Sequence, residues 1–308
     1  MKIINKMLLT LGLVGTLGSL SSCTKVDTSE VSIILPNGTP ALAMGTLLND
    51  VDAEVVTDSA LLQTALVTGK TDFVIAPLIL GTKLFVNSKS SYILEAVITT
   101  NNAYLVSNNE LTPASLQGKE IVGFQKTNTP GIMLETYLEM NNISASVQYE
   151  ANVNQSVAAF KNSSTEYALV AEPQLTQLEQ TYPNLNVLNI GEEICEKGEF
   201  IPQAALFINP NSVNDEDCKA FMKNLNKNIE RLNRKSKGYA EELIESEISY
   251  FKNYSVEVLT KALPRCNLAY KRGIDNIESI SNYYESCDKY SGNATFNGLR
   301  PNENFFNK

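Results

Sequence analysis

The sequence predicts an α/β protein of two similar lobes with a ligand cleft between them. Short apolar runs that suit buried strands alternate with segments of helical pattern, which indicates mostly parallel sheets with helices on both faces. This alternation occurs twice, in residues 31–98 and again in residues 120–180. The chain has 308 residues, 43% of them hydrophobic, which is enough for two medium-sized domains.

The first half begins with an apolar strand, a turn and a helix. Thr39-Pro40 predicts the start of that helix, because Thr is a favoured cap and Pro is favoured in the first turn. Pro77 ends a later buried strand. The expected strands are residues 31–35, 54–57, 72–76 and 92–98, and the expected helices are residues 41–48, 59–68 and 78–86.

The second half repeats this order, with turn residues and prolines at similar places. N-G-T-P at residues 37–40 corresponds to T-N-T-P at residues 127–130, and the second strand-ending proline is Pro173. The two prolines of each half are 37 and 43 residues apart. Any α/β chain gives some alternation, but this shared pattern favours a repeat. The expected strands are residues 120–124, 147–149 and 167–171, and the expected helices are residues 132–140, 155–161 and 174–180.

After a further strand at residues 204–208 the chain becomes mainly helical. The expected helices are residues 215–235, 239–251 and 256–263. The remainder from residue 292 is rich in Asn and Gly and is expected to wrap the surface.

The first residues are typical of an export signal. Lys2 and Lys6 precede an apolar run from Met7 to Leu20, whose 14 residues are too few to cross the roughly 30 Å hydrocarbon core as a helix. Leu20-Ser21-Ser22-Cys23 resembles the lipobox of bacterial lipoproteins in order and position. Residues 1–22 are therefore predicted to be a signal peptide, Cys23 to be acylated and residues 23–30 to form a tether. An ordinary signal peptide with an incidental cysteine is the alternative.

This signal predicts an extracytoplasmic protein anchored by lipid. It would lie on the outer face of the cell membrane, or on its periplasmic side in a two-membrane cell. Outside the cytoplasm, the remaining Cys195, Cys218, Cys266 and Cys287 suggest two disulfides with three alternative pairings. The pairs 195–218 and 266–287 close the shortest loops and are favoured. No C-x₂-C spacing supports a metal site of four cysteines.

Composition excludes several functions. Histidine is absent, which removes Ser-His-Asp and Cys-His catalysis and His-ligated zinc. The net charge of −9 argues against a nucleic-acid partner. No cluster of metal-ligating residues and no cofactor motif is visible, so neither metal nor cofactor is expected. The first arginine is Arg231, so neither lobe offers an early guanidinium clamp for a carboxylate.

Ligands of parallel α/β sheets bind beyond the carboxyl ends of the strands. The predicted ligand-binding residues are Asn37, Gly38, Thr39, Pro40, Ser59, Pro77, Asn101, Asn102, Tyr104, Lys126, Thr127, Asn128, Thr129, Gly131 and Glu172. Several of these belong to helix starts, whose free N–H groups suit an accepting ligand atom. The alternative is that Thr39 and Thr129 only cap their own helices.

Glu172 is the most distinctive of these candidates. A carboxylate at the end of a buried strand suits an amine or aminopyrimidine, although an acid before Pro173 also suits the first turn of a helix. Tyr104 could stack on a planar ring. Lys126 could bind an anion or be a solvated surface residue. Arg265 could reach the cleft from the C-terminal part of the chain, but a surface role is favoured. Donor-rich loops with one carboxylate favour a neutral or mildly cationic heterocycle, while helix starts and Lys126 keep a sulfonate or nitrate open.

Four segments resemble a known family: IILPNGTPALAMGTLL, GKTDFVIAPL, EAVITTNNAYLVS and YALVAEPQL. They are similar to the type II periplasmic binding proteins, within the solute-binding lipoproteins of ABC importers that include nitrate, sulfonate and thiamine-precursor binders. The resemblance implies one lobe of residues 31–102 plus 206–308 and another of residues 103–205. It also implies crossovers near residues 99–104 and 201–207 and hinge closure around a solute.

The resemblance implies a receptor without chemistry of its own. Its ligand would be a small polar organic solute, such as a thiamine pyrimidine precursor, and its protein partner a transmembrane permease. A monomer is expected. Pyrimidine synthases of similar fold depend on a histidine that this chain lacks. The alternatives are a surface lipoprotein enzyme, which turnover lost in Glu172→Gln would favour, and an adhesive lipoprotein, which a filled cleft would favour.

Overall fold

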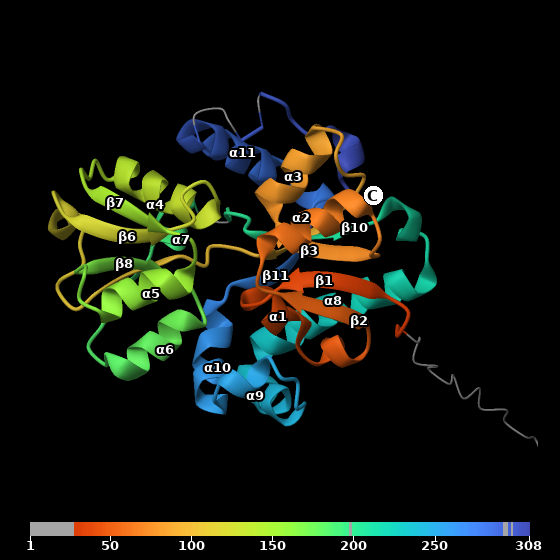
Figure 1. Cartoon of the computed structure of the whole chain (residues 1–308), viewed down its shortest axis with the longest axis horizontal. Helices are drawn as coiled ribbons and strands as arrows, with labels where there is room; N and C mark the ends of the chain where they lie inside the picture. The colour runs from red at the N-terminus through yellow and green to blue at the C-terminus, as the bar shows by residue number, and fades with distance from the viewer. Residues whose placement is uncertain (1–27, 197–198, 292–294, 297) are drawn as a thin grey trace, which may run out of the picture.

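The protein has two lobes, each built around one mixed β-sheet (Figure 1). The computed structural model describes residues 28–196, 199–291, 295–296 and 298–308. The predicted signal peptide, Cys23 and tether residues 23–27 lie outside the described residues. Within the described part of the chain, no helix combines the length and the apolar character needed to cross a membrane.

The first lobe contains a six-stranded sheet in the order β11-β4-β10-β3-β1-β2. Its strands are β1 (Ser32–Pro36), β2 (Asp52–Val56), β3 (Phe73–Pro77), β4 (Ile93–Thr99), β10 (Ala204–Ile208) and β11 (Leu268–Arg272). Its helices are α1 (Thr39–Met44), α2 (Ser59–Thr68), α3 (Leu78–Val86), α8 (Glu216–Arg234), α9 (Ser236–Glu245), α10 (Val256–Ala262) and α11 (Ile277–Ser291). β1 runs parallel to β2 and β3. β10 pairs antiparallel with β3 and β4, and β11 pairs antiparallel with β4.

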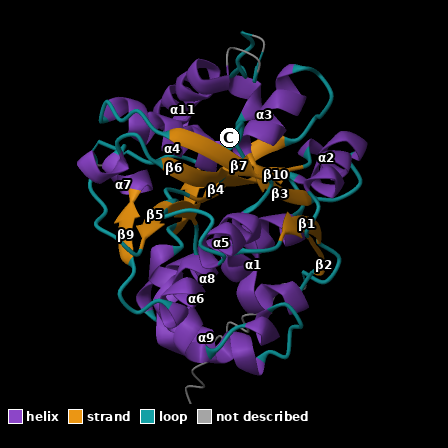
Figure 2. Ribbon diagram, turned by 60° about the vertical axis from the view of Figure 1, so that its left-hand side comes forward, coloured by secondary structure: helices purple, strands orange, loops and turns teal. Residues whose placement is uncertain are grey.

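Both faces of this sheet are buried. In β10, Leu206 and Ile208 point into one hydrophobic cluster while Ala205 and Phe207 point into the other, as the two-residue period of a strand requires. Figure 2 shows α1, α8 and α9 on one side of the sheet and α3 and α11 on the opposite side. Because helices cover both faces of the sheet, its central strands are continuous apolar runs in the sequence.

The second lobe contains a five-stranded sheet in the order β7-β6-β8-β5-β9. Its strands are β5 (Tyr104–Ser107), β6 (Glu120–Phe124), β7 (Ser146–Glu150), β8 (Tyr167–Val170) and β9 (Asn186–Asn189). Its helices are α4 (Thr129–Met140), α5 (Val153–Lys161), α6 (Gln174–Thr181) and α7 (Ile190–Glu193). β6 is parallel to β7 and β8, and β5 is antiparallel to β8 and β9.

The predicted two-lobed α/β fold is confirmed, but the expectation of mostly parallel sheets is wrong. Each sheet contains a strand that enters from a crossing between the lobes, β10 in the first and β5 in the second, and these strands run against their neighbours. The predicted lobe boundaries stay a prediction. The described strands of the first sheet fall within residues 32–99 and 204–272, and those of the second within residues 104–189.

The end of the chain is part of the core, which corrects the expectation that it wraps the surface. The Phe305 side chain is fully buried, with its ring centroid 4.8 Å from that of Phe85 and 6.2 Å from that of Phe207. Asn307 donates its side-chain N–H to the buried Glu95 carboxylate. The few aromatic residues after residue 292 stand among polar ones in the sequence, so the hydrophobic pattern did not predict that Phe305 is buried.

The four described cysteines are free thiols, so the predicted disulfides are wrong. Cys218 and Cys266 lie in one hydrophobic cluster of the first lobe and Cys287 in the other, across the sheet. Cys195 lies beyond α7 of the second lobe, half-buried against Asn101. Each favoured pair would have to join across a lobe boundary or a sheet, whereas a disulfide needs Cβ atoms about 4 Å apart. The buried thiols instead pack as small apolar groups.

Candidate ligand-binding site

A cavity of about 580 Å³ lies where the two lobes meet. Most of its wall follows the carboxyl ends of strands, as expected for α/β sheets. Pro36, Val56 and Pro77 end β1, β2 and β3, and residues 37–40 and 57–59 follow the first two strands. The second lobe contributes residues after β6, β7 and β8. A solute in this cavity would contact both lobes.

Neutral polar side chains dominate the wall. The amide-bearing residues are Asn37, Asn102, Gln125, Asn128, Asn152, Asn154, Gln174, Gln177, Gln203 and Asn253. Hydroxyl groups come from Thr39, Thr57, Ser59, Thr99, Thr129, Tyr250 and Tyr254. Among the described wall residues the charged ones are Asp58 and Glu172. Such a wall donates and accepts hydrogen bonds in all directions but holds little charge.

The structure brings ten of the predicted residues to this wall. They are Asn37, Gly38, Thr39, Pro40, Ser59, Pro77, Asn102, Asn128, Thr129 and Glu172. Their contact with a ligand stays a prediction. Thr129 also joins the lobes, because its hydroxyl hydrogen-bonds that of Tyr283 on α11.

The other five predicted residues lie off the wall. Asn101 is part of the crossing between the lobes, with φ of 48°, and its side-chain oxygen accepts the N–H of Ile201 at 2.6 Å. Tyr104 is buried in β5 and donates its hydroxyl to the backbone carbonyl of Arg265 at 2.6 Å. Both residues serve the junction of the lobes rather than the cavity.

The remaining three predicted residues that lie off the cavity wall, Lys126, Thr127 and Gly131, follow β6. Lys126 and Thr127 are exposed, and the Lys126 Nζ lies 5.7 Å from the centroid of the Tyr149 ring. Gly131 packs on the Lys126 backbone so closely that a Cβ there would lie 2.5 Å from the Lys126 carbonyl oxygen. Of this loop, Gln125 and Asn128 reach the wall.

Sequence reasoning missed several wall residues. Gln125, Asn152 and Asn154 follow strand ends, so the rule that found the other loops also applied to them. Tyr250, Asn253 and Tyr254 come from the segment between α9 and α10, and no local pattern indicated that it folds back to the cavity.

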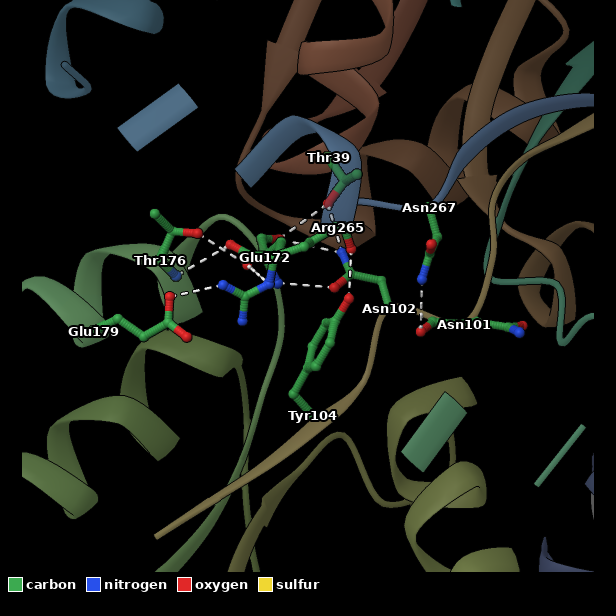
Figure 3. A network of polar contacts seen from close by, with 9 residues as sticks. All are labelled: Thr39, Asn101, Asn102, Tyr104, Glu172, Thr176, Glu179, Arg265 and Asn267. Atoms are coloured by element: carbon green, nitrogen blue, oxygen red, sulfur yellow. Dashed lines mark hydrogen bonds and ion pairs between the residues drawn. The ribbon is translucent and has the colours of Figure 1, made fainter. Parts of the chain in front are cut away.

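Asn102 connects the lobes beside the cavity (Figure 3). Its side-chain oxygen accepts the N–H of Glu172 at 2.8 Å, and its side-chain nitrogen donates to Thr39 Oγ1 at 3.1 Å. Thr39 also donates to the Glu172 carbonyl at 3.1 Å. Asn102 is 4% exposed, so these bonds are shielded from water. One amide thus joins the segment after β8 of the second lobe to α1 of the first.

Glu172 does not offer its carboxylate to the cavity. Its oxygens accept the backbone N–H and hydroxyl of Thr176 at 3.1 and 2.9 Å, and Arg265 Nε lies 3.0 Å from Oε1. Arg265 Nη1 also contacts Glu179 Oε2 at 2.7 Å (Figure 3). Arg265 precedes β11 of the first lobe, and both carboxylates belong to the second. The expectation that Arg265 is a surface residue is therefore wrong, since it links the lobes.

Burial raises the pKa of the Glu172 carboxyl to about 7, against the opposing effects of the Arg265 charge and the Thr176 hydrogen bonds. The carboxylate is thus most firmly paired with Arg265 in mildly alkaline solution. No group of three or more His, Cys, Asp or Glu in the described part of the chain could hold a metal ion.

Solved structures share this architecture. An ABC transporter protein from Parabacteroides distasonis aligns with a TM-score of 0.77 and 18% identity, over 92% of this chain and 99% of its own. The periplasmic aliphatic sulphonate binding protein SsuA of Escherichia coli aligns with a TM-score of 0.71 and 13% identity, over 90% and 91%. This chain has the periplasmic binding protein fold.

The zinc-bound ligand-binding component of an ABC-type import system from Staphylococcus aureus has the same fold. It aligns with a TM-score of 0.66 and 14% identity, over 91% of this chain and 96% of its own. No protein-family profile and no curated protein matches the sequence. At these identities the periplasmic binding protein fold is what the chain shares with the solved proteins.

Removing the Arg265 guanidinium should destabilise the protein. Arg265→Ala leaves the Glu172 carboxylate, whose side chain is 0% exposed, buried without its charge partner. At pH 8, above the raised pKa of Glu172, we expect the free energy of unfolding in urea to fall by about 3 kcal/mol. Lys261→Ala is the control, because its pair with Glu257 is exposed on both sides and its loss costs at most about 0.5 kcal/mol. Equal effects of the two substitutions would contradict the linking role.

Glu172 should also make stability depend on pH. Its folded-state pKa of about 7 is above the ordinary value of 4.5, so between these values the folded protein holds a proton that unfolding releases. The free energy of unfolding therefore falls as pH rises through this window. The advantage of wild type over Glu172→Gln should shrink by more than about 1 kcal/mol from pH 5 to pH 7 in urea titrations. An unchanged or growing advantage would refute the raised pKa.

Proposed function

We propose that this protein is the extracytoplasmic solute-binding component of an ABC importer. It captures a small polar organic solute between its lobes by hinge closure and delivers it to a transmembrane permease. The cavity of about 580 Å³ with walls from both lobes carries the proposal. A solute that contacts both walls binds the closed arrangement better than an open one, so it shifts the lobes toward closure. The fold shared with ABC transporter binding proteins supports the same role.

The first ligand class to test is a planar polar heterocycle, such as a thiamine pyrimidine precursor. Phe124, Tyr250 and Tyr254 give the wall aromatic surface beside its amides, which suits a flat ring with hydrogen-bonding edges. The Glu172 carboxylate no longer supports this choice, because Thr176 and Arg265 occupy it. The proposal includes no reaction, no cofactor and a monomeric receptor.

Lipid anchoring through Cys23 belongs to the same proposal, supported by the lipobox-like residues 20–23. Expression of the full chain in a bacterial host, followed by separation of membranes from soluble protein, tests it. We expect the wild type in the membrane pellet and Cys23→Ala in the soluble or unprocessed fraction. Cys195→Ala should stay with the membrane. A soluble wild type would rule out the anchor and leave the solute-binding role untouched.

Asn128→Ala tests the cavity itself. Asn128 lies on the wall, and its side chain does not cap the helix that it precedes, so the loss of this side chain should leave the fold intact. We expect the affinity for the bound solute to fall about five- to tenfold, the equivalent of one hydrogen bond, in isothermal titration calorimetry. Asn108→Ala, an exposed amide away from the wall, is the matched control. Unchanged affinity in Asn128→Ala would place the ligand elsewhere.

A further inference from the structure

The charge of the cavity wall bears on which solutes it accepts. An anion would meet no Lys or Arg among the described residues of the wall. The Nζ of Lys126 lies over the Tyr149 ring, and the guanidinium of Arg265 is paired with Glu172 and Glu179. Both nearby cations are therefore engaged outside the cavity.

Helix starts are the remaining source of positive potential, and one N–H group at each of four of them is already paired within the chain. Gly38, before α1, donates its N–H to the Tyr250 hydroxyl at 2.5 Å. The first turns of α2, α5 and α6 donate to Asp58 Oδ1 at 2.8 Å, Asn152 Oδ1 at 3.1 Å and Glu172 Oε2 at 3.1 Å. The chain supplies its own acceptor in each case, so these N–H groups are not open to a ligand.

The starts of α1 and α4 are less fully paired, because their N-caps Gly38 and Asn128 make no side-chain capping bond. One helix start supplies roughly half an elementary charge. Asp58 is an exposed residue on the same wall, and one of its carboxylate oxygens accepts the N–H of Ala60. Its full negative charge exceeds the fraction that either helix start supplies. An anion entering the cavity would lose hydration without gaining a cationic side chain among the described wall residues.

We propose that the cavity rejects anionic solutes and binds an uncharged or cationic polar molecule, and that Asp58 is the residue that determines this selectivity. The inference rests on the proposed solute-binding function and adds the charge class of the ligand. Amide and hydroxyl groups bind uncharged polar groups well, and Asp58 tolerates or attracts a cation. This selectivity would differ from that of the aliphatic sulphonate binding protein whose fold the chain shares.

Native mass spectrometry of the full chain identifies the ligand. The protein is extracted in mild detergent, incubated with an extract of its host and denatured to release the solute, whose formula gives its charge at neutral pH. An uncharged or cationic solute supports the inference. A sulfonate, carboxylate or phosphate overturns it while the proposed function stands. A protein that retains no solute contradicts the proposed function itself.

Asp58→Asn tests the residue, because Asn is an equally good N-cap and the substitution removes the charge alone. The probes are the released solute and an analogue of it carrying a carboxylate. We expect wild type to bind the analogue at least about tenfold more weakly, and Asp58→Asn to narrow that ratio at least about threefold at low salt. Asp52→Asn, an exposed carboxylate off the wall, should leave the ratio unchanged. A ratio that does not change in Asp58→Asn overturns the role of Asp58.

Discussion

The arrangement of the two lobes depends on the side chain of Asn102. Its amide bonds both backbone groups of Glu172 and the hydroxyl of Thr39, while its own backbone pairs with the side chain of Gln203 at 2.8 and 3.2 Å. Asn102 and Gln203 belong to the two segments that cross between the lobes. A buried backbone group without a partner is costly, so these reciprocal bonds fix the mutual position of the crossings. Asn102 and Gln203 are themselves part of the cavity wall, so their bonds also fix the wall.

Next to this neutral junction, ion pairs hold the lobes together, whereas the cavity wall carries few charged side chains among its described residues. Arg265 takes both carboxylates that face it, and Lys126 lies outside the wall. An unpaired ion in this space would have to lose water without compensation. The strongest electrostatic interactions therefore serve the interface between the lobes, and the cavity wall presents amides, hydroxyls, aromatic rings and the exposed carboxylate of Asp58.

The sequence predicted those parts of the fold whose signals are local. The helix at residues 59–68 has an Asp cap and a following Gly, and the strand at residues 204–208 is a continuous apolar run, so both were predicted with their observed bounds. β11 was missed because Leu268 is its one buried residue, so its sequence LAYKR is not a continuous apolar run. The roles of Glu172 and Arg265 could not be predicted, because they depend on two segments that are 93 residues apart in the sequence and meet only in the folded protein.

The position of Phe305 in the core has a consequence for the order of assembly. The second sheet is made entirely from residues 104–189, so its strands are all synthesised before the final third of the chain. The first lobe instead needs Phe305 against Phe85 and Asn307 against Glu95, contacts that join the chain's last residues to its first third. Closing such long loops is slow and becomes available only when the whole chain has emerged. A chain that is threaded through a membrane from its N-terminus would thus keep its first lobe incomplete until its last residues had crossed.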